Sequence, residues 1–152
     1  MDKFMRIAID EAKKGIKKGG GPFGAVIVKN NKLIAKAHNA VTLSNDPTAH
    51  AEICAIRKAC KKLKTFDLHG CVIYSTCEPC PMCFSAIHWA RISTVFYGTT
   101  KKDAMLIGFD DKLLYDILEK KRKPAFLMKQ IDYIENKVLF GDWSKLKSKK
   151  LY

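Results

Sequence analysis

Two short motifs carry the residues most capable of chemistry: His-Ala-Glu at 50–52 and Cys-Pro-Met-Cys at 80–83. Imidazole and thiolate bind zinc, and a catalytic zinc site uses three protein ligands while water takes the fourth position. Cysteines three residues apart at the start of a helix share one face and can reach one ion. We therefore predict that His50, Cys80 and Cys83 bind zinc and that Glu52 carries protons beside it.

Each motif has a second interpretation when it is taken alone. The cysteine pair could be a redox motif or half of a structural zinc site. His50 could be a hydrogen-bonded core histidine. The combination, H-x-E followed by P-C-x-x-C, is typical of zinc deaminases that act on nucleobases. Cys77 precedes the second motif, and we expect it beside the site without binding the metal, because a fourth protein ligand would close the water position.

Apolar spacing and turn residues predict the elements that must position these side chains. Asp46 is a candidate cap for the helix that carries His50, with Pro47 in its first turn. Strands alternate with helices after an initial hairpin, which indicates an α/β domain with helices on both sheet faces. We expect helices over 2–18, 47–63 and 81–91, and strands over 24–29, 32–37, 71–76, 94–98 and 125–131.

Composition places the chain among single-domain globular proteins. It has 152 residues, of which 47% are hydrophobic, and a net charge of +13. A basic excess of this size can bind nucleic acid, but the lysines lie in many short runs along the chain, which favours a dispersed, solvated basic surface. Neither a signal peptide nor an apolar run of membrane-spanning length is present, so we expect no membrane association and a cytoplasmic location.

Over nearly its full length the chain resembles the cytidine/deoxycytidylate deaminase superfamily, and within it the bacterial-type guanine deaminases. The resemblance implies a three-layer α/β/α sandwich with a mixed five-stranded sheet, one zinc ion per subunit, and hydrolysis of guanine to xanthine and ammonia. It also implies that His50 borders the base. The matching segments are GGPFGAVIV (20–28), SNDPTAHAE (44–52), CEPCPMC (77–83), AIHWAR (86–91), GFDD (108–111) and the C-terminus with Trp143 and Lys-Lys-Leu-Tyr.

The same resemblance assigns further roles in substrate binding and catalysis. Asp111 is implied as a second acid, although it could simply cap a helix. Asn39 is implied to read the purine edge, although it could bond its own backbone. Phe23 and Trp89 are implied to contact the base, although both could be packing residues. Tyr152 is implied to close the site of a partner subunit.

The resemblance further implies a homodimer in which residues 134–152 are exchanged between subunits of this single-domain chain (1–152). Two other enzymes remain as alternatives, a tRNA adenosine deaminase, which the charge favours, and a cytosine deaminase. A zinc-stabilised binding domain is the non-enzymatic alternative, and the presence of Glu52 argues against it.

Overall fold

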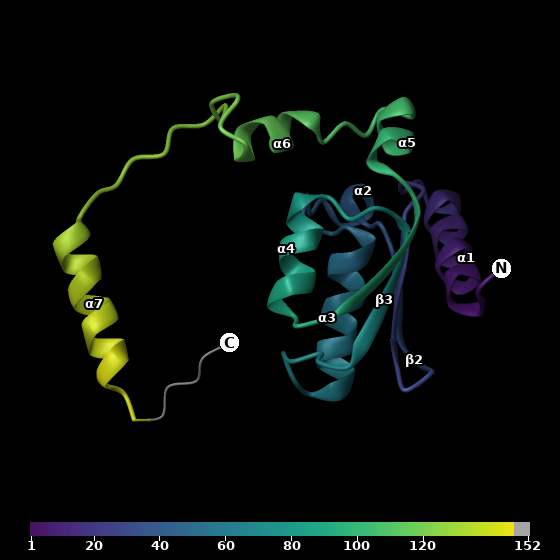
Figure 1. Ribbon diagram of the computed structural model, residues 1–152, viewed down its shortest axis with the longest axis horizontal. Helices are drawn as coiled ribbons and strands as arrows, with labels where there is room; N and C mark the ends of the chain where they lie inside the picture. The colour runs from purple at the N-terminus through teal and green to yellow at the C-terminus, as the bar shows by residue number, and fades with distance from the viewer. Residues whose placement is uncertain (148–152) are drawn as a thin grey trace.

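The computed structural model of the chain describes residues 1–147, and Figure 1 shows the order of its elements. A four-stranded sheet, ordered β2-β1-β3-β4, lies at its centre. The elements are α1 (Lys3–Lys17), β1 (Gly24–Lys29), β2 (Lys32–His38), α2 (Val41–Ser44), α3 (Ala51–Leu63), β3 (Cys71–Cys77), α4 (Pro81–Trp89), β4 (Thr94–Thr99), α5 (Lys101–Leu106), α6 (Lys112–Leu118) and α7 (Tyr133–Lys145).

The sheet is mixed. β1 pairs antiparallel with both β2 and β3, whereas β3 and β4 run parallel. Helix α1 lies on one side of the sheet, and α3 and α4 lie on the other (Figure 1). Because β1 is covered on both faces, nearly all of its residues are buried. A Cβ atom on Gly24 would lie 2.1 Å from the carbonyl oxygen of Ala8, so glycine allows α1 to approach the start of β1.

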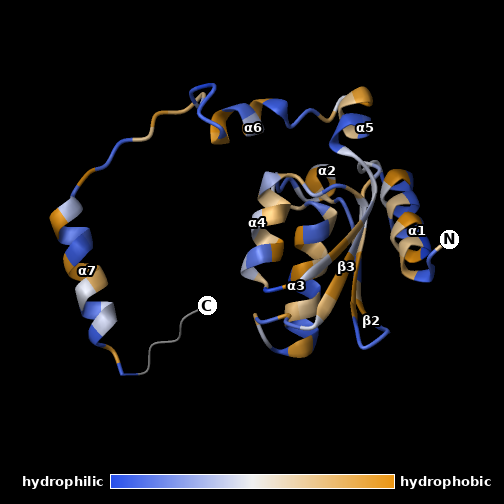
Figure 2. Ribbon diagram, in the orientation of Figure 1, coloured by the Kyte–Doolittle hydropathy of each residue, from blue (hydrophilic) through white to orange (hydrophobic). Residues whose placement is uncertain are grey.

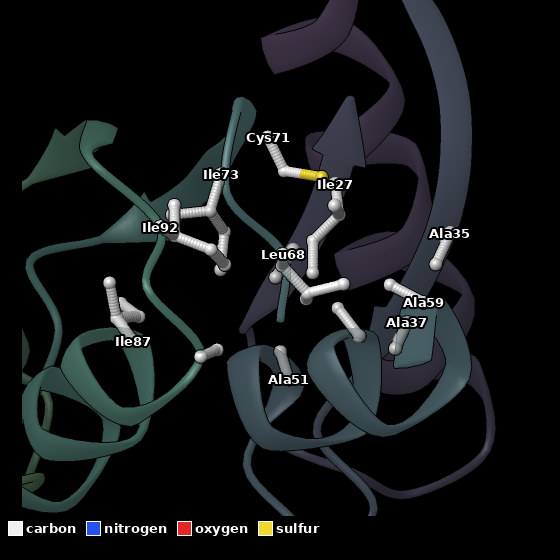
Figure 3. Packing of buried hydrophobic residues seen from close by; sticks show 13 residues of the cluster. Ile27, Ala35, Ala37, Ala51, Ala59, Leu68, Cys71, Ile73, Ile87 and Ile92 are labelled. Atoms are coloured by element: carbon white, nitrogen blue, oxygen red, sulfur yellow. The ribbon is translucent and has the colours of Figure 1, made fainter. Parts of the chain in front are cut away.

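The core fills the space between the sheet and α3 (Figure 3). Ile27 and Ile73 come from neighbouring strands and meet Leu68, and all three side chains are fully buried. Small residues on α3, Ala51, Ala55 and Ala59, let the helix pack closely against this surface. A rigid core of this kind supports the loops at the sheet edge, where the candidate site lies.

The structure confirms most of the predicted elements to within a few residues. The hairpin turns at Asn30 and Asn31, which both adopt positive φ angles (49° and 60°). Two such residues are the signature of the two-residue turn that matches the natural twist of paired strands. The asparagines therefore set the register in which Lys29 faces Lys32.

The predicted start of the second long helix is wrong. Helix α3 begins at Ala51, and His50 is its N-cap. Asp46 caps a turn instead, because its carboxylate accepts hydrogen bonds from the backbone amide and the hydroxyl of Thr48 (2.8 and 2.6 Å). The difference matters for function. As the N-cap, His50 has an extended backbone, so its side chain can point beyond the end of α3 and away from the side of the helix.

The prediction of a fifth strand over 125–131 is also wrong, because these residues form no strand and the described sheet has four. A strand needs a neighbouring strand for its hydrogen bonds, and Figure 1 shows this segment far from the sheet. We call residues 112–147 the C-terminal arm. Figure 2 shows hydrophobic residues along it, away from the sheet. Its exposed large apolar residues are Leu113, Leu114, Leu118, Phe126, Leu127, Met128, Ile131, Tyr133, Ile134, Val138, Leu139, Phe140, Trp143 and Leu146.

No helix within residues 1–147 combines the length and the apolar character needed to span a membrane. The arm's hydrophobic residues are interspersed with charged ones, as expected for a segment that packs against protein.

Candidate active site

The predicted ligands come together at one end of the strands, where β2, β3 and β4 end and β1 begins. His50 is the N-cap of α3, and Cys80 is the N-cap of α4. Pro81 follows as the first helical residue of α4, a position at which proline lacks only an amide that the helix does not use. Cys83, in the first turn of α4, is fully buried. Two helix N-termini therefore converge on one point, and their partial positive charge favours thiolates there.

The distances among the three ligand atoms fit tetrahedral zinc. The Nδ1 atom of His50 lies 3.6 Å from Sγ of Cys80 and 3.5 Å from Sγ of Cys83. Zinc bonds of about 2.0–2.1 Å to nitrogen and about 2.3 Å to sulfur, at a tetrahedral angle, place these atoms about 3.5 Å apart. Within the described residues, these three form the one group of His, Cys, Asp and Glu side chains suited to a metal ion. Cys77 donates instead to the carbonyl of Thr100 (3.7 Å) and lies outside the group.

The protonation of the cluster shows how its members interact. The hydrogen bond with the Cys83 thiol, helped by the nearby His50 ring, lowers the pKa of Cys80 to about 4. The contact with Cys80 raises the pKa of His50. The hydrogen bond with Cys80, together with burial, raises the pKa of Cys83. The cluster thus already favours one thiolate, and a metal ion would displace the remaining protons.

Glu52 lies in the first turn of α3 and is 6% exposed. Its carboxylate accepts a hydrogen bond from the hydroxyl of Ser75 (2.8 Å) and another from the thiol of Cys83 (3.5 Å). Burial raises the pKa of Glu52, because the charged form loses its hydration. A buried carboxyl with a raised pKa beside a metal cluster has the properties of a group that takes up and returns a proton.

The cluster opens into a pocket of about 600 Å³. His50, Glu52 and Cys80 contribute to its lining, and so do the predicted substrate residues Phe23 and Asn39. The pocket has room for a purine base, and its walls combine apolar surface with a few polar groups, as small-molecule sites commonly do.

Asn39 bonds its own backbone, which was the alternative to a role in substrate binding, and it also lines the pocket. Its side-chain oxygen accepts a hydrogen bond from the backbone amide of Val41 (3.2 Å), so it does stabilise its own loop. The residue is nevertheless a pocket wall, and the part of the carboxamide that remains to meet a ligand is the NH₂ donor. Phe23 likewise packs against the core and meets Phe109 edge-on, with 4.9 Å between ring centroids, while lining the pocket.

Asp111 also lines the pocket. It is the residue before α6, yet its side chain makes no capping hydrogen bond; Asp110 instead accepts from the amide of Lys112 (2.8 Å). Burial and the negative charge of Cys80 raise the pKa of Asp111. The Asp111 carboxyl therefore lies close enough to Cys80 and His50 to interact with their charges.

One predicted substrate residue does not line this pocket. Trp89 lies at the end of α4, is 63% exposed and lines a separate depression with His88, Arg91 and Ile92. Trp89 lies on the surface because it is at the far end of α4, more than two helical turns from Cys80. Tyr152 lies outside the described residues.

Several residues of the site were missed from sequence, among them Ser75, Glu78 and Lys101. Ser75 had a detectable signal, since residues 71, 73, 75 and 77 alternate inward along β3 and a buried hydroxyl needs a partner. Glu78 and Lys101 also line the pocket. Neither belongs to a periodic pattern, and their proximity depends on the parallel pairing of β3 with β4.

Comparisons with known proteins agree with this geometry. The cytidine and deoxycytidylate deaminase zinc-binding region matches residues 1–99. A guanine deaminase of Bacillus subtilis is 46% identical over 153 residues, covering 99% of this chain and 98% of that protein. The X-ray structure of guanine deaminase from Bacillus subtilis has a TM-score of 0.91 and 45% identity, covering 100% of this chain and 99% of that one.

Other relatives act on tRNA. A tRNA-specific adenosine deaminase of Aquifex aeolicus is 48% identical over 99 residues, which cover 65% of this chain and 66% of that protein. The match to the zinc-binding region spans most of the chain and contains all three candidate ligands and Glu52. The chain belongs to the cytidine and deoxycytidylate deaminase family.

Proposed function

We propose that this protein is a zinc-dependent hydrolase that converts guanine to xanthine and ammonia. One observation carries the proposal: the His50, Cys80 and Cys83 cluster and the buried Glu52 open together into a base-sized pocket. The likeness to a guanine deaminase over essentially the whole chain supports guanine as the base.

The chemistry begins with water at the cluster. Zinc held by the three ligands, one ion per subunit, would lower the pKa of a water molecule to about 7. Glu52 would accept one proton from the attacking water and return it to the ring nitrogen beside the carbon under attack. Ser75 holds one carboxylate oxygen of Glu52 at 2.8 Å, so the other oxygen is directed to the proton transfer. The second proton of the attacking water then passes to the exocyclic amine with the help of Asp111, and the carbon–nitrogen bond breaks to release ammonia.

The pocket walls orient the base. The NH₂ group of Asn39 donates to an acceptor atom on the purine edge, and the ring of Phe23 provides an apolar surface for the base. His50 lies at the metal side of the pocket and borders the base there. These contacts place the exocyclic amine of guanine between the metal cluster and Asp111.

We also propose a cytoplasmic homodimer of single-domain, three-layer α/β/α subunits in which residues 134–152, the end of the C-terminal arm and the segment after it, are exchanged. The arm exposes a long series of large apolar side chains, and α6 and α7 contain no buried residue. Exposed apolar surface of this extent marks an interaction site. A second copy would bury it and bring the segment after α7, with Tyr152, to the partner's pocket.

A product assay tests the enzymatic proposal. The zinc-loaded protein is incubated with guanine, adenine and cytosine, and the products are identified by mass together with released ammonia. Glu52→Gln should retain the hydrogen bond from Ser75 but lose about 10²–10⁴-fold in rate. Glu119→Gln, in an exposed ion pair with Lys121, is the matched control and should retain full activity. Equal ammonia release by wild type and Glu52→Gln would reject the role of Glu52.

A tRNA adenosine deaminase is the second candidate, favoured by the net charge of +13 and by the Aquifex aeolicus relative. A tRNA substrate requires an open pocket, whereas an exchanged arm would cover it. The same assay therefore includes a tRNA anticodon stem-loop. Formation of inosine without xanthine would replace guanine deamination by this second function.

A mixing experiment tests arm exchange. One variant lacks the last ten residues and keeps Glu52; the other carries Glu52→Ala and keeps the whole arm. Each is expected to be inactive alone, and unfolding and refolding them together should restore activity, since one mixed site combines an intact Glu52 with an intact arm. Full activity of the truncated variant by itself would show that the arm end is not needed.

A further inference from the structure

Lys101 lies between the C-terminal arm and the loop, residues 78–80, that presents Cys80. Its backbone amide donates a hydrogen bond to Oε2 of Glu78 (3.0 Å), and its Nζ atom lies 4.0 Å from Oε1 of the same residue. The ammonium group also lies 4.2 Å from the centroid of the Tyr115 ring. Glu78 is part of the loop that presents Cys80, and Tyr115 belongs to α6. One side chain therefore contacts both segments.

Helix α6 has little else to hold it in place. None of its residues is buried. Its other ion pairs, from Lys112 and Arg122 to Asp116, lie within α6 and the turn that follows it. Contacts made only within a segment cannot fix that segment against the rest of the molecule. The cation–π contact of Lys101 with Tyr115 does connect α6 to the body, and it also fixes the direction of approach.

The position of α6 determines the position of Asp111. Asp111 and Tyr115 are four residues apart, one on each side of the first helical turn, so their side chains lie on the same face. The amide of Tyr115 also donates to the carbonyl of Asp111 (3.2 Å), which makes the two residues one rigid unit. A movement of α6 that carries the Tyr115 ring away from Lys101 therefore also moves Asp111, whose carboxyl lines the pocket.

We propose that Lys101 is a positioning residue: anchored on Glu78, it holds Tyr115 and thereby keeps Asp111 at the metal cluster. This inference rests on the proposed deaminase function, in which Asp111 is the second acid. Lys101 acts through Asp111, since its ammonium is engaged by the Glu78 carboxylate and the Tyr115 ring.

Steady-state kinetics with guanine test the chain of contacts. Lys101→Met keeps the length of the side chain and removes its charge. We expect kcat to fall about three- to tenfold with little change in KM, which corresponds to the loss of one half-exposed cation–π contact. Tyr115→Leu should have the same effect, whereas Lys101→Arg and Tyr115→Phe should retain most activity. Lys102→Met, on the next residue, is the matched control and should change neither constant.

A double-mutant cycle shows whether Lys101 acts through Asp111. In an Asp111→Asn background, Lys101→Met should lower kcat less than twofold further, because the group that it positions is already lost. If instead the two effects multiply, or if Lys101→Met raises KM and leaves kcat unchanged, Lys101 contacts the substrate directly and the positioning role is overturned.

Hydrogen–deuterium exchange of the zinc-loaded protein gives a readout that needs no activity. Lys101→Met should speed exchange of amides in residues 109–118 at least threefold, and Lys102→Met should not. Unchanged exchange in Lys101→Met would reject the contact as an anchor. A wild-type protein that makes no xanthine would reject the proposed function, while the exchange result would still decide whether Lys101 holds α6.

Discussion

Replacement of Glu11 by glutamine should weaken the attachment of α1 to β2, and the loss should depend on pH in a defined direction. Glu11 is 6% exposed on α1. Its Oε1 atom accepts a hydrogen bond from Lys14 (2.8 Å) and lies 3.2 Å from Nζ of Lys36 on β2. The ring of His38 lies 3.5 Å from Oε2. Because His38 precedes Asn39, this cluster supports the strand end that presents a pocket wall.

The magnitude follows from the pKa of Glu11. Burial acts to raise it, but the hydrogen bonds from Lys14 and Lys36 outweigh burial and lower the pKa from 4.5 to about 2. At about 1.4 kcal/mol per pKa unit, this shift corresponds to about 3.4 kcal/mol. Both lysines are about half exposed and are screened by solvent, so we expect about 2 kcal/mol.

The sign is that of a carboxyl whose pKa is lower in the folded than in the unfolded state. The stabilisation is complete above pH 4.5 and is lost as the pH falls towards 2. Urea unfolding of wild type and Glu11→Gln between pH 7 and pH 3 measures the difference. It should be about 2 kcal/mol at pH 7 and less than half of that at pH 3.

Asp10→Asn is the matched control on the same helix. Asp10 forms an exposed ion pair with Lys13 at 3.9 Å, and its loss should cost less than about 0.5 kcal/mol. A difference between wild type and Glu11→Gln that stays constant from pH 7 to pH 3 would refute the argument, because it would show that the ionised form of Glu11 contributes nothing.

Three further predictions concern the site and its support. Ser75→Ala should lower kcat/KM about 10- to 100-fold in the ammonia assay, because a buried hydrogen bond to the Glu52 carboxylate is worth about 1.5–3 kcal/mol; unchanged kcat/KM would mean that Glu52 is oriented by other contacts. Zinc removal with a chelator should abolish ammonia release and lower Tm, and added zinc should restore both, since the metal binds the folded state. Gly24→Ala should destabilise the protein by about 1–3 kcal/mol or more in urea unfolding, because the new methyl group would overlap the backbone of Ala8.

Local patterns were sufficient for most secondary structure. The hairpin, α1, β3, α4 and β4 follow from apolar periodicity and from turn residues such as Asn30 and Asn31. The start of α3 could not be read in this way, because Asp46 offers the same carboxylate to a helix or to a turn, and the turn with Thr48 competes successfully. The segment 125–131 has strand-like composition, but a strand exists only where another edge accepts its hydrogen bonds.

The sequence by itself determined the chemistry of the centre: residue types and spacing were enough to predict His50, Cys80 and Cys83 as ligands and Glu52 beside them. Tertiary structure decided their surroundings. Ser75, Glu78 and Lys101 reach the pocket only because β3 and β4 run parallel and end together. Trp89 and Asp111 both follow recognisable motifs, yet only Asp111 faces the pocket. The spacing of the ligands is a local property of neighbouring residues. The pocket walls come from segments far apart in the sequence, and the packing of the whole chain decides whether those segments meet.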